Sequence, residues 1–167
     1  LSAEQRVHID GIHRSNQRMA DLVSEMLIVS SLDLGTLVVT PEKTNIATVI
    51  AEVVKDQKVV FADKKMHITE MYDHKLPRIL CDAEMVRLIL RHLLSNAIKY
   101  TSEGGKVTVQ VEQKPREKIL PGSKGSIVIT ITDNGHGIPN DAIDKVFIKF
   151  FRWKNFLHTD TDGTGLG

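Results

Sequence analysis

The sequence predicts an α+β protein in which one long bundle-forming helix precedes a two-layer α/β sandwich, a mixed sheet covered by helices. Three observations support this fold class. The first 32 residues carry apolar side chains at heptad spacing and contain no proline. Two amphipathic helical patterns follow. Segments 106–112 and 126–132 then alternate apolar and polar residues, as half-buried strands do. We therefore predict two parts, residues 1–35 and residues 36–167.

Size and composition exclude several classes of protein. The chain has 167 residues, of which 41% are hydrophobic and 26% charged, as in ordinary globular domains. A formal net charge of +1 gives no support for a nucleic-acid-binding surface. No apolar run approaches the roughly 18 residues of a membrane span, and there is no signal-peptide pattern. Cys81 is the single cysteine and cannot form an internal disulfide, which favours a cytoplasmic location.

The first predicted helix runs from Ser2 to about Leu32 and ends before Gly35. Its apolar stripe cannot be buried by one helix alone, so it needs a partner helix from another chain or from an upstream segment. His8 and His13 lie on this helix without a nucleophile or metal ligand at helical spacing, which favours a solvated face over a catalytic role.

The sandwich is predicted from shorter patterns. A helix is expected over 45–58 with Thr44 as its N-cap, followed by a strand over 67–72. Asp82 is expected to cap a helix that ends near Tyr100. The strands 106–112 and 126–132 are expected to pair antiparallel across an exposed loop of residues 113–125. Cys81 is expected to be a buried, unreactive side chain at a strand end.

The helix from Asp82 to Tyr100 carries two different faces. The side expected in the core comprises Val86, Ile89, Leu90, Leu93, Leu94 and Ala97. His92, Asn96 and Lys99 fall together on the other side. An amide oxygen can bind Mg²⁺ and an ammonium can neutralise phosphate, so this row suits a metal–phosphate ligand. On spacing alone, a simple solvated face remains the alternative.

Two glycine-containing segments could also approach a ligand. In DNGHGIP, residues 133–139, an aspartate follows a strand and alternating glycines allow close backbone approach, although the same letters are common in turns. In GTGLG, residues 163–167, alternating glycines could wrap phosphates. No dinucleotide-fold strand precedes this segment and the lysine of a P-loop is missing, so neither of those folds is predicted.

Taken in order, these segments resemble the ATP-binding catalytic domain of sensor histidine kinases, which belongs to the superfamily of gyrases, chaperones, histidine kinases and mismatch-repair ATPases. HLLSNAIKYTSEGG resembles the N box, DNGHGIP the G1 box, VFIKFFR the F box and GTGLG the G2 box. The resemblance implies a Bergerat-type ATP-binding fold. It also implies an ATP-dependent protein histidine kinase that uses Mg²⁺, with residues 153–162 as the ATP lid.

The resemblance assigns roles to individual residues. It implies Asn96 as the Mg²⁺ ligand, Lys99 and Arg152 as contacts to the phosphates, and Asp133 as the acceptor of the adenine amino group. The full set assigned to nucleotide binding is Asn96, Lys99, Tyr100, Asp133, Gly135, Gly137, Ile138, Phe150, Arg152, Gly163, Thr164, Gly165, Leu166 and Gly167. His92, Lys99 and Arg152 are the candidate catalytic residues. His92 either helps to hold Mg²⁺ through water, acts as a base or orienting group for the acceptor imidazole, or is a bystander facing the dimerisation domain.

Residues 1–35 resemble the second helix of the dimerisation and phosphotransfer hairpin of this family, which implies a homodimer through this helix. Neither His8 nor His13 has the sequence context of the family's phosphoacceptor, so we expect the acceptor to be absent from this chain and both ends to be incomplete. The implied reaction passes the γ-phosphoryl group from ATP to that histidine and then to an aspartate of a response-regulator receiver domain. The alternatives are a degenerate module that binds nucleotide without turnover, and another ATPase or serine kinase of the superfamily. Membrane attachment of the parent protein is left open.

Overall fold

A computed structural model describes residues 2–72, 76–114, 125–152 and 165 of the chain. The backbone divides into two compact units, which are treated separately below. One unit comprises Leu1–Val38 and Asp141–Gly167, and the other comprises Val39–Asn140. The second unit contains the sheet and most of the predicted site residues.

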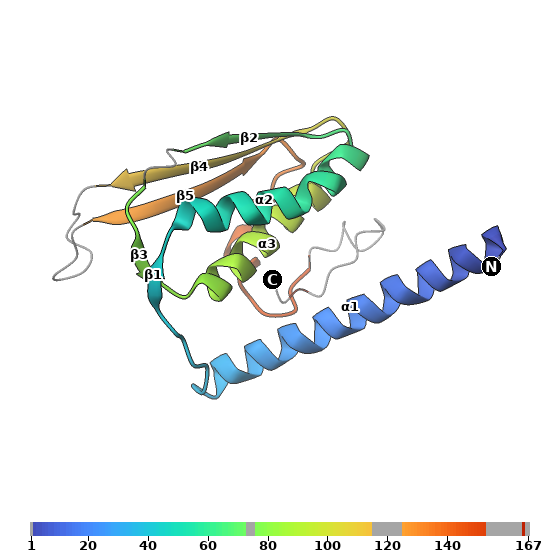
Figure 1. The fold of residues 1–167 in the computed structure, drawn as a ribbon, viewed down its shortest axis with the longest axis horizontal. Helices are drawn as coiled ribbons and strands as arrows, with labels where there is room; N and C mark the ends of the chain where they lie inside the picture. The colour runs from blue at the N-terminus through green and yellow to red at the C-terminus, as the bar shows by residue number, and fades with distance from the viewer. Residues whose placement is uncertain (1, 73–75, 115–124, 153–164, 166–167) are drawn as a thin grey trace. The chain divides into compact units, whose positions relative to one another are not determined.

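The long helix α1 (Ala3–Asp33) dominates the first unit (Figure 1). It begins with a capping box, in which the Ser2 Oγ accepts from the Gln5 backbone N–H at 3.1 Å while the Gln5 side chain accepts from the Ser2 N–H at 2.9 Å. It ends where Gly35 takes the left-handed conformation, at a φ of 64°. The predicted helix and its end are therefore confirmed.

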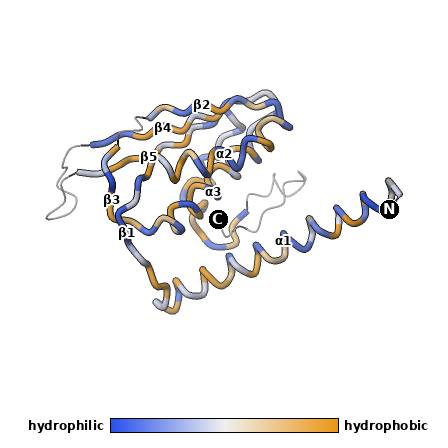
Figure 2. The backbone as a smooth tube through the Cα atoms, in the orientation of Figure 1, coloured by the Kyte–Doolittle hydropathy of each residue, from blue (hydrophilic) through white to orange (hydrophobic). Residues whose placement is uncertain are grey.

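Many apolar side chains of α1 are exposed, and hydrophobic and hydrophilic residues alternate along the helix (Figure 2). The exposed set comprises Val7, Ile9, Ile12, Met19, Leu22, Val23, Met26, Leu27 and Leu32. His8 and His13 are exposed as well, as the solvated-face interpretation predicts. No helix in the described part of the chain is long and apolar enough to cross a membrane.

The second unit contains a three-stranded mixed sheet with the order β2-β4-β5. Its strands are β2 (His67–Met71), β4 (Lys106–Lys114) and β5 (Ser126–Asp133). β2 pairs with β4 in parallel, and β4 pairs with β5 antiparallel. Helices α2 (Ile46–Asp63) and α3 (Ala83–Tyr100) cover one face of this sheet (Figure 1). The predicted two-layer sandwich with a mixed sheet is confirmed.

The core lies between the two helices and the sheet. Strand β4 turns Val107, Val109 and Val111 inward, as its alternation predicts. The side chains that are most completely buried are Ile46, Ile50, Val53, Val54, Leu94, Val107, Val109 and Thr101. Thr101 is the polar member of this set, and it follows directly on the last residue of α3.

Three details of the second unit correct the sequence-based prediction. Thr44 is not the N-cap of α2, because it pairs with Ile79 in a small antiparallel pair of strands, β1 (Glu42–Thr44) and β3 (Ile79–Cys81), and Asn45 takes the cap position. The helix also continues beyond residue 58, to Asp63. Burial of Phe61, which is only 2% exposed, explains that extra turn.

Other corrections concern burial and a strand boundary. Ile89 and Leu93 were expected in the core, but they are 57% and 47% exposed because α3 turns a different face to the sheet. Cys81 is half-buried rather than buried. The first two residues of the expected loop 113–125 belong to β4, and residues 115–124 lie outside the described part of the chain.

Candidate nucleotide site

Helix α3 supplies the predicted metal–phosphate row. Its N-cap is Asp82, whose carboxylate accepts from the backbone N–H groups of Thr40 at 2.9 Å and Met85 at 3.1 Å. These two bonds hold the pKa of the Asp82 carboxyl below its usual value. The side chain of Asn96 is exposed on this helix, whereas Lys99 is half-buried. The helix thus presents an amide and an ammonium near its C-terminal end.

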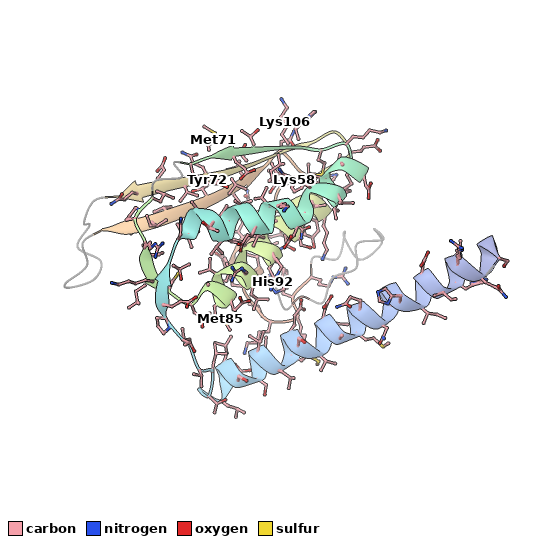
Figure 3. The ribbon with its side chains drawn as sticks, in the orientation of Figure 1. Lys58, Met71, Tyr72, Met85, His92 and Lys106 are labelled. Atoms are coloured by element: carbon pink, nitrogen blue, oxygen red, sulfur yellow. The ribbon has the colours of Figure 1, made fainter. Side chains whose placement is uncertain are left out.

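His92 begins the same row, one turn before Asn96. Figure 3 labels it midway along α3, and its side chain is half-buried. Asn96 is exposed while His92 and Lys99 are half-buried, and Ile89 and Leu93, which were predicted on the opposite side, are exposed as well.

Asp133 ends strand β5, where it pairs with Val107 of β4. Its Oδ1 atom accepts from the Gly135 backbone N–H at 2.9 Å and lies 3.5 Å from the Thr101 hydroxyl. Among the described residues, no protein donor bonds to Oδ2 of this exposed carboxylate. One carboxylate oxygen is thus fixed by the protein, and the other can accept from a ligand.

The turn after Asp133 is tied to the end of α3. The backbone N–H of His136 donates to the Tyr100 carbonyl at 3.1 Å, and its Nδ1 lies 2.8 Å from the same oxygen. That contact requires a proton on Nδ1, because a carbonyl oxygen can only accept. A Cβ on Gly135 would lie 2.3 Å from this oxygen, so only glycine fits there. The turn and the helix end therefore form one packed corner.

Gly137 provides the open side of this corner. Its φ is 71°, in the left-handed region, and a Cβ built on it would meet no atom within 4 Å. Ile138 next to it is 57% exposed. A carboxylate acceptor, an open stretch of backbone and an exposed apolar side chain lie together, which is the combination that suits a flat, amino-bearing base.

Three residues that support this corner were not predicted from the sequence. Lys64 donates from Nζ to the carbonyls of Ile98 at 2.6 Å and Thr101 at 3.1 Å. The Asn134 side chain accepts from the Lys106 backbone N–H at 2.6 Å, which joins the turn to the start of β4. Thr101 places its hydroxyl beside Asp133. Asn134 lies within the predicted DNGHGIP motif and Thr101 within HLLSNAIKYTSEGG, although neither was assigned a role, whereas Lys64 lies outside every predicted motif.

The remaining predicted site residues belong to the first unit. The Phe150 backbone N–H donates to the Gly165 carbonyl at 2.7 Å, and both residues have positive φ angles, of 64° and 70°. A Cβ on Gly165 would lie 2.8 Å from the Phe150 carbonyl carbon. The structure thus brings Phe150 of the VFIKFFR segment next to Gly165 of the GTGLG segment. Arg152 is half-buried. Gly163, Thr164, Leu166, Gly167 and the lid 153–162 lie outside the described residues.

The second half of the chain matches the sequence model of a known ATPase family. The model described as "Histidine kinase-, DNA gyrase B-, and HSP90-like ATPase" matches residues 81–167. The chain belongs to this family. Every candidate site residue predicted from the sequence falls within the matched range, whereas Lys64 lies before it. The family does not by itself establish what each residue does.

Individual relatives of this ATPase family narrow the assignment. The chain is 32% identical over 155 residues to the adaptive-response sensory kinase SasA of Synechocystis, covering 92% of this chain and 38% of that protein. The crystal structure of full-length ShkA in complex with AMPPNP has a TM-score of 0.75 and 26% identity, covering 99% of this chain and 32% of that one. A structure of the histidine kinase ThkA with the response regulator TrrA has a TM-score of 0.66 and 19% identity, covering 91% of this chain and 42% of that one. At that identity it shows the fold alone.

The chain spans about a third of the length of SasA and ShkA. The similarity extends over α1 as well as the sandwich, since it covers nearly the whole chain. The chain therefore contains the ATP-binding catalytic region of a histidine kinase, as the sequence predicts. The described residues hold no group of three or more His, Cys, Asp or Glu side chains that could bind a metal ion.

Proposed function

We propose that this chain binds Mg·ATP at the corner between α3 and the Asp133–Ile138 turn, and that the whole protein is a protein histidine kinase. The observation that carries the proposal is the packing of Asp133, Gly135 and His136 against the last turn of α3. This packing sets a carboxylate acceptor beside the helix that carries an amide and an ammonium. ShkA, which shares the fold, was solved with the ATP analogue AMPPNP.

Asp133 would select the base. Its outward Oδ2 can accept from the 6-amino group of adenine, whereas guanine presents a carbonyl oxygen at that position and would repel the carboxylate. Gly137 leaves room for the ring, and Ile138 and Tyr100 offer apolar surface to it. The site should therefore prefer ATP to GTP.

The metal and phosphates would be held by the exposed side of α3. Mg²⁺ usually takes only one or two protein oxygens and binds phosphates and water with its other positions, so the single Asn96 amide oxygen fits it. When bound, the ion neutralises charge on the phosphate oxygens. Lys99 and Arg152 would contact the phosphates, a role that suits a guanidinium because its donors match phosphate geometry. The glycines Gly163, Gly165 and Gly167, with Thr164, Leu166 and Phe150, would complete the phosphate loop and lid.

In the proposed reaction, a nitrogen of the acceptor imidazole bonds to the γ-phosphorus while the bond from phosphorus to the bridging oxygen of ADP breaks. Phosphoryl transfer of this kind depends on positioning and on neutralised charge rather than on covalent chemistry by the protein. His92 would either act as a base or orient the acceptor imidazole, or it would be a bystander on this face.

The partners follow from the same proposal. The exposed apolar stripe of α1 would pack in a helical bundle with a second copy of the protein, with residues 1–35 as one helix of a dimerisation hairpin. A response-regulator receiver domain would accept the phosphoryl group, as the complex of ThkA with TrrA suggests for this fold. The lone Cys81 favours a cytoplasmic location.

Nucleotide binding by the chain tests the proposal. Calorimetry should give tighter binding of ATP than of GTP, and Asp133→Ala should weaken ATP binding about 10- to 100-fold, the range expected for a hydrogen bond to a charged group. Asp56→Ala removes an equally exposed carboxylate from the middle of α2 and should leave the affinity unchanged. Equal binding of both nucleotides, unaffected by Asp133→Ala, would refute the assignment.

Incubation with labelled ATP tests the location of the acceptor. We expect no stable phosphohistidine on this chain, since the exposed His8 and His13 lack the acceptor context. A supplied dimerisation hairpin with an acceptor histidine should become labelled. ATP binding without any transfer to that hairpin would instead indicate a non-catalytic nucleotide-binding module.

A further inference from the structure

Lys64 lies outside the predicted motifs, but its side chain contacts α3, the helix that carries Asn96 and Lys99. It is the C-cap residue of α2, and its side chain is half-buried. Its Nζ donates to the carbonyl oxygens of Ile98 at 2.6 Å and Thr101 at 3.1 Å. These two carbonyls flank Lys99 and Tyr100, which the proposed function places at the phosphates and the base.

The end of α3 needs such a partner. The last four carbonyls of a helix have no N–H donor within the helix, and the helix dipole adds partial negative charge there. Lys64 provides a cation to Ile98, one of these carbonyls, and His136 provides its backbone N–H to Tyr100, another. The end of α3 is therefore held from two sides, by α2 and by the Asp133 turn.

The neighbouring Lys65 shows that the contact is particular to Lys64. Lys65 is largely exposed and forms a surface ion pair with Glu103 at 2.6 Å. It contacts a side chain rather than the backbone of α3. Exposed pairs of this kind contribute little to stability. Lys64 therefore bonds to the backbone at the end of α3, whereas the adjacent Lys65 bonds to a side chain in the loop that follows.

The backbone of Lys64 reinforces the link. Its carbonyl accepts from the Gly104 N–H at 3.0 Å, and Gly104 has a φ of 75°. The Gly105 carbonyl in turn accepts from the His67 N–H at 2.8 Å. The loop that follows α3 is therefore fastened to the turn between α2 and β2 along its length, and the Lys64 side chain bonds to the helix end just before it.

We propose that Lys64 is a positioning residue for nucleotide binding. It holds the last turn of α3 so that Asn96 and Lys99 face the phosphates. The inference rests on the proposed function, because Lys64 can position a nucleotide-binding helix only if α3 binds a nucleotide. It adds the C-cap residue of α2, which precedes the matched family range, to the residues that determine ATP affinity.

The test compares Lys64→Met with Lys65→Met. Methionine keeps most of the length of the lysine side chain and removes the ammonium group. Lys64→Met therefore loses the bonds to the carbonyls of Ile98 and Thr101, whereas Lys65→Met loses the ion pair with Glu103. Binding of ATP and of adenosine is measured by calorimetry well below the unfolding temperature. Lys64→Met should weaken ATP binding about 10-fold and adenosine binding much less, since the phosphate contacts depend on the helix end. Lys65→Met should stay within about 2-fold for both.

Two further measurements separate positioning from general stability. Lys64→Arg restores a cation with several donors and should recover part of the ATP affinity. Amide hydrogen exchange needs no nucleotide, and it should become faster in residues 97–101 in Lys64→Met but not in Lys65→Met. If Lys64→Met does not fold, Lys64→Gln, which keeps a shorter donor, takes its place with the same expectations.

Specific outcomes overturn the inference. A folded Lys64→Met with wild-type ATP affinity would do so, as would equal losses for ATP and adenosine, which would indicate a purely structural role. If wild-type protein binds no ATP, the proposed function fails, while unchanged hydrogen exchange in Lys64→Met refutes the Lys64 contact itself. The two failures are therefore distinguishable.

Discussion

Replacing Gly135 by alanine tests whether the turn and the end of α3 form one packed corner. The added Cβ would lie 2.3 Å from the Tyr100 carbonyl oxygen and 2.9 Å from both the Asp133 carboxylate and the Thr101 hydroxyl. Non-bonded atoms normally sit at about 3.5 Å, so the first contact is roughly 1 Å too close. Something in the corner has to move.

The structure indicates which part moves. The Tyr100 carbonyl belongs to the last turn of α3, and Lys64 holds the nearby carbonyls of Ile98 and Thr101, so the helix end resists displacement. Thr101 is only 2% exposed, so it cannot turn out into solvent without opening the buried corner. The turn must therefore lift away from the helix. Overpacking of this kind costs about 1–3 kcal/mol, or roughly 5–15 °C in unfolding temperature for a unit of this size.

The assay is thermal unfolding followed by circular dichroism, together with ATP binding by calorimetry. Gly135→Ala should unfold at a lower temperature and bind ATP more weakly, since the lifted turn carries Asp133 with it. Gly137→Ala is the matched control for the unfolding temperature alone, because its Cβ meets nothing within 4 Å and only the positive φ is strained, whereas Gly137 itself belongs to the proposed nucleotide site. That strain costs about 1–2 kcal/mol, and Gly137→Asn should recover part of it. If Gly135→Ala unfolds and binds ATP like wild type, the packed corner does not exist.

Two other predictions concern the helix ends and α1. The folded state lowers the pKa of Asp82, so its contribution to stability is complete above about pH 4 and is lost as the pH falls through the lowered value. Acid titrations of the unfolding temperature should therefore show a shallower drop for Asp82→Ala than for wild type, and parallel curves would contradict this. Gly11 lies inside α1, and a Cβ built on it would meet no atom within 4 Å. Gly11→Ala should therefore stabilise α1 by about 0.5–1 kcal/mol and increase the helix content measured by circular dichroism. Unchanged helix content would contradict this prediction.

The elements that the sequence predicts well are those that repeat a pattern over many residues. Helices α1 and α3 and strands β4 and β5 are each at least eight residues long, and their amphipathic periods are clear. Strands β1 and β3 have three residues each, too few to establish an alternation, and they pair across a long separation, Thr44 with Ile79. These strands form only by pairing with each other, and a pairing between distant segments leaves no pattern in the local sequence.

The exposed face of α3 shows a second limit of prediction from the sequence. A count of apolar residues placed Ile89 and Leu93 in the core, yet the buried face is centred on Leu90, Leu94 and Ala97. A helix with apolar residues over more than half of its circumference can turn several faces to a sheet, and the sheet decides which one is buried. His92, Asn96 and Lys99 stay outside the buried core, because charges and amides cannot occupy a core without partners.

The sequence predicts the candidate site only where the residues that form it follow one another in the chain. Asp133, Gly135 and Gly137 follow one another, so the spacing of the motif already contains the acceptor and the close approach of the backbone. Lys64 and Asn134 position the same corner through backbone carbonyls and N–H groups of other elements. Almost any sequence can offer such backbone partners, so no motif marks Lys64, and the DNGHGIP motif contains Asn134 without indicating its role. Because a small displacement of a binding group can cost much of its affinity, residues of this second kind should influence nucleotide binding although they never touch the nucleotide.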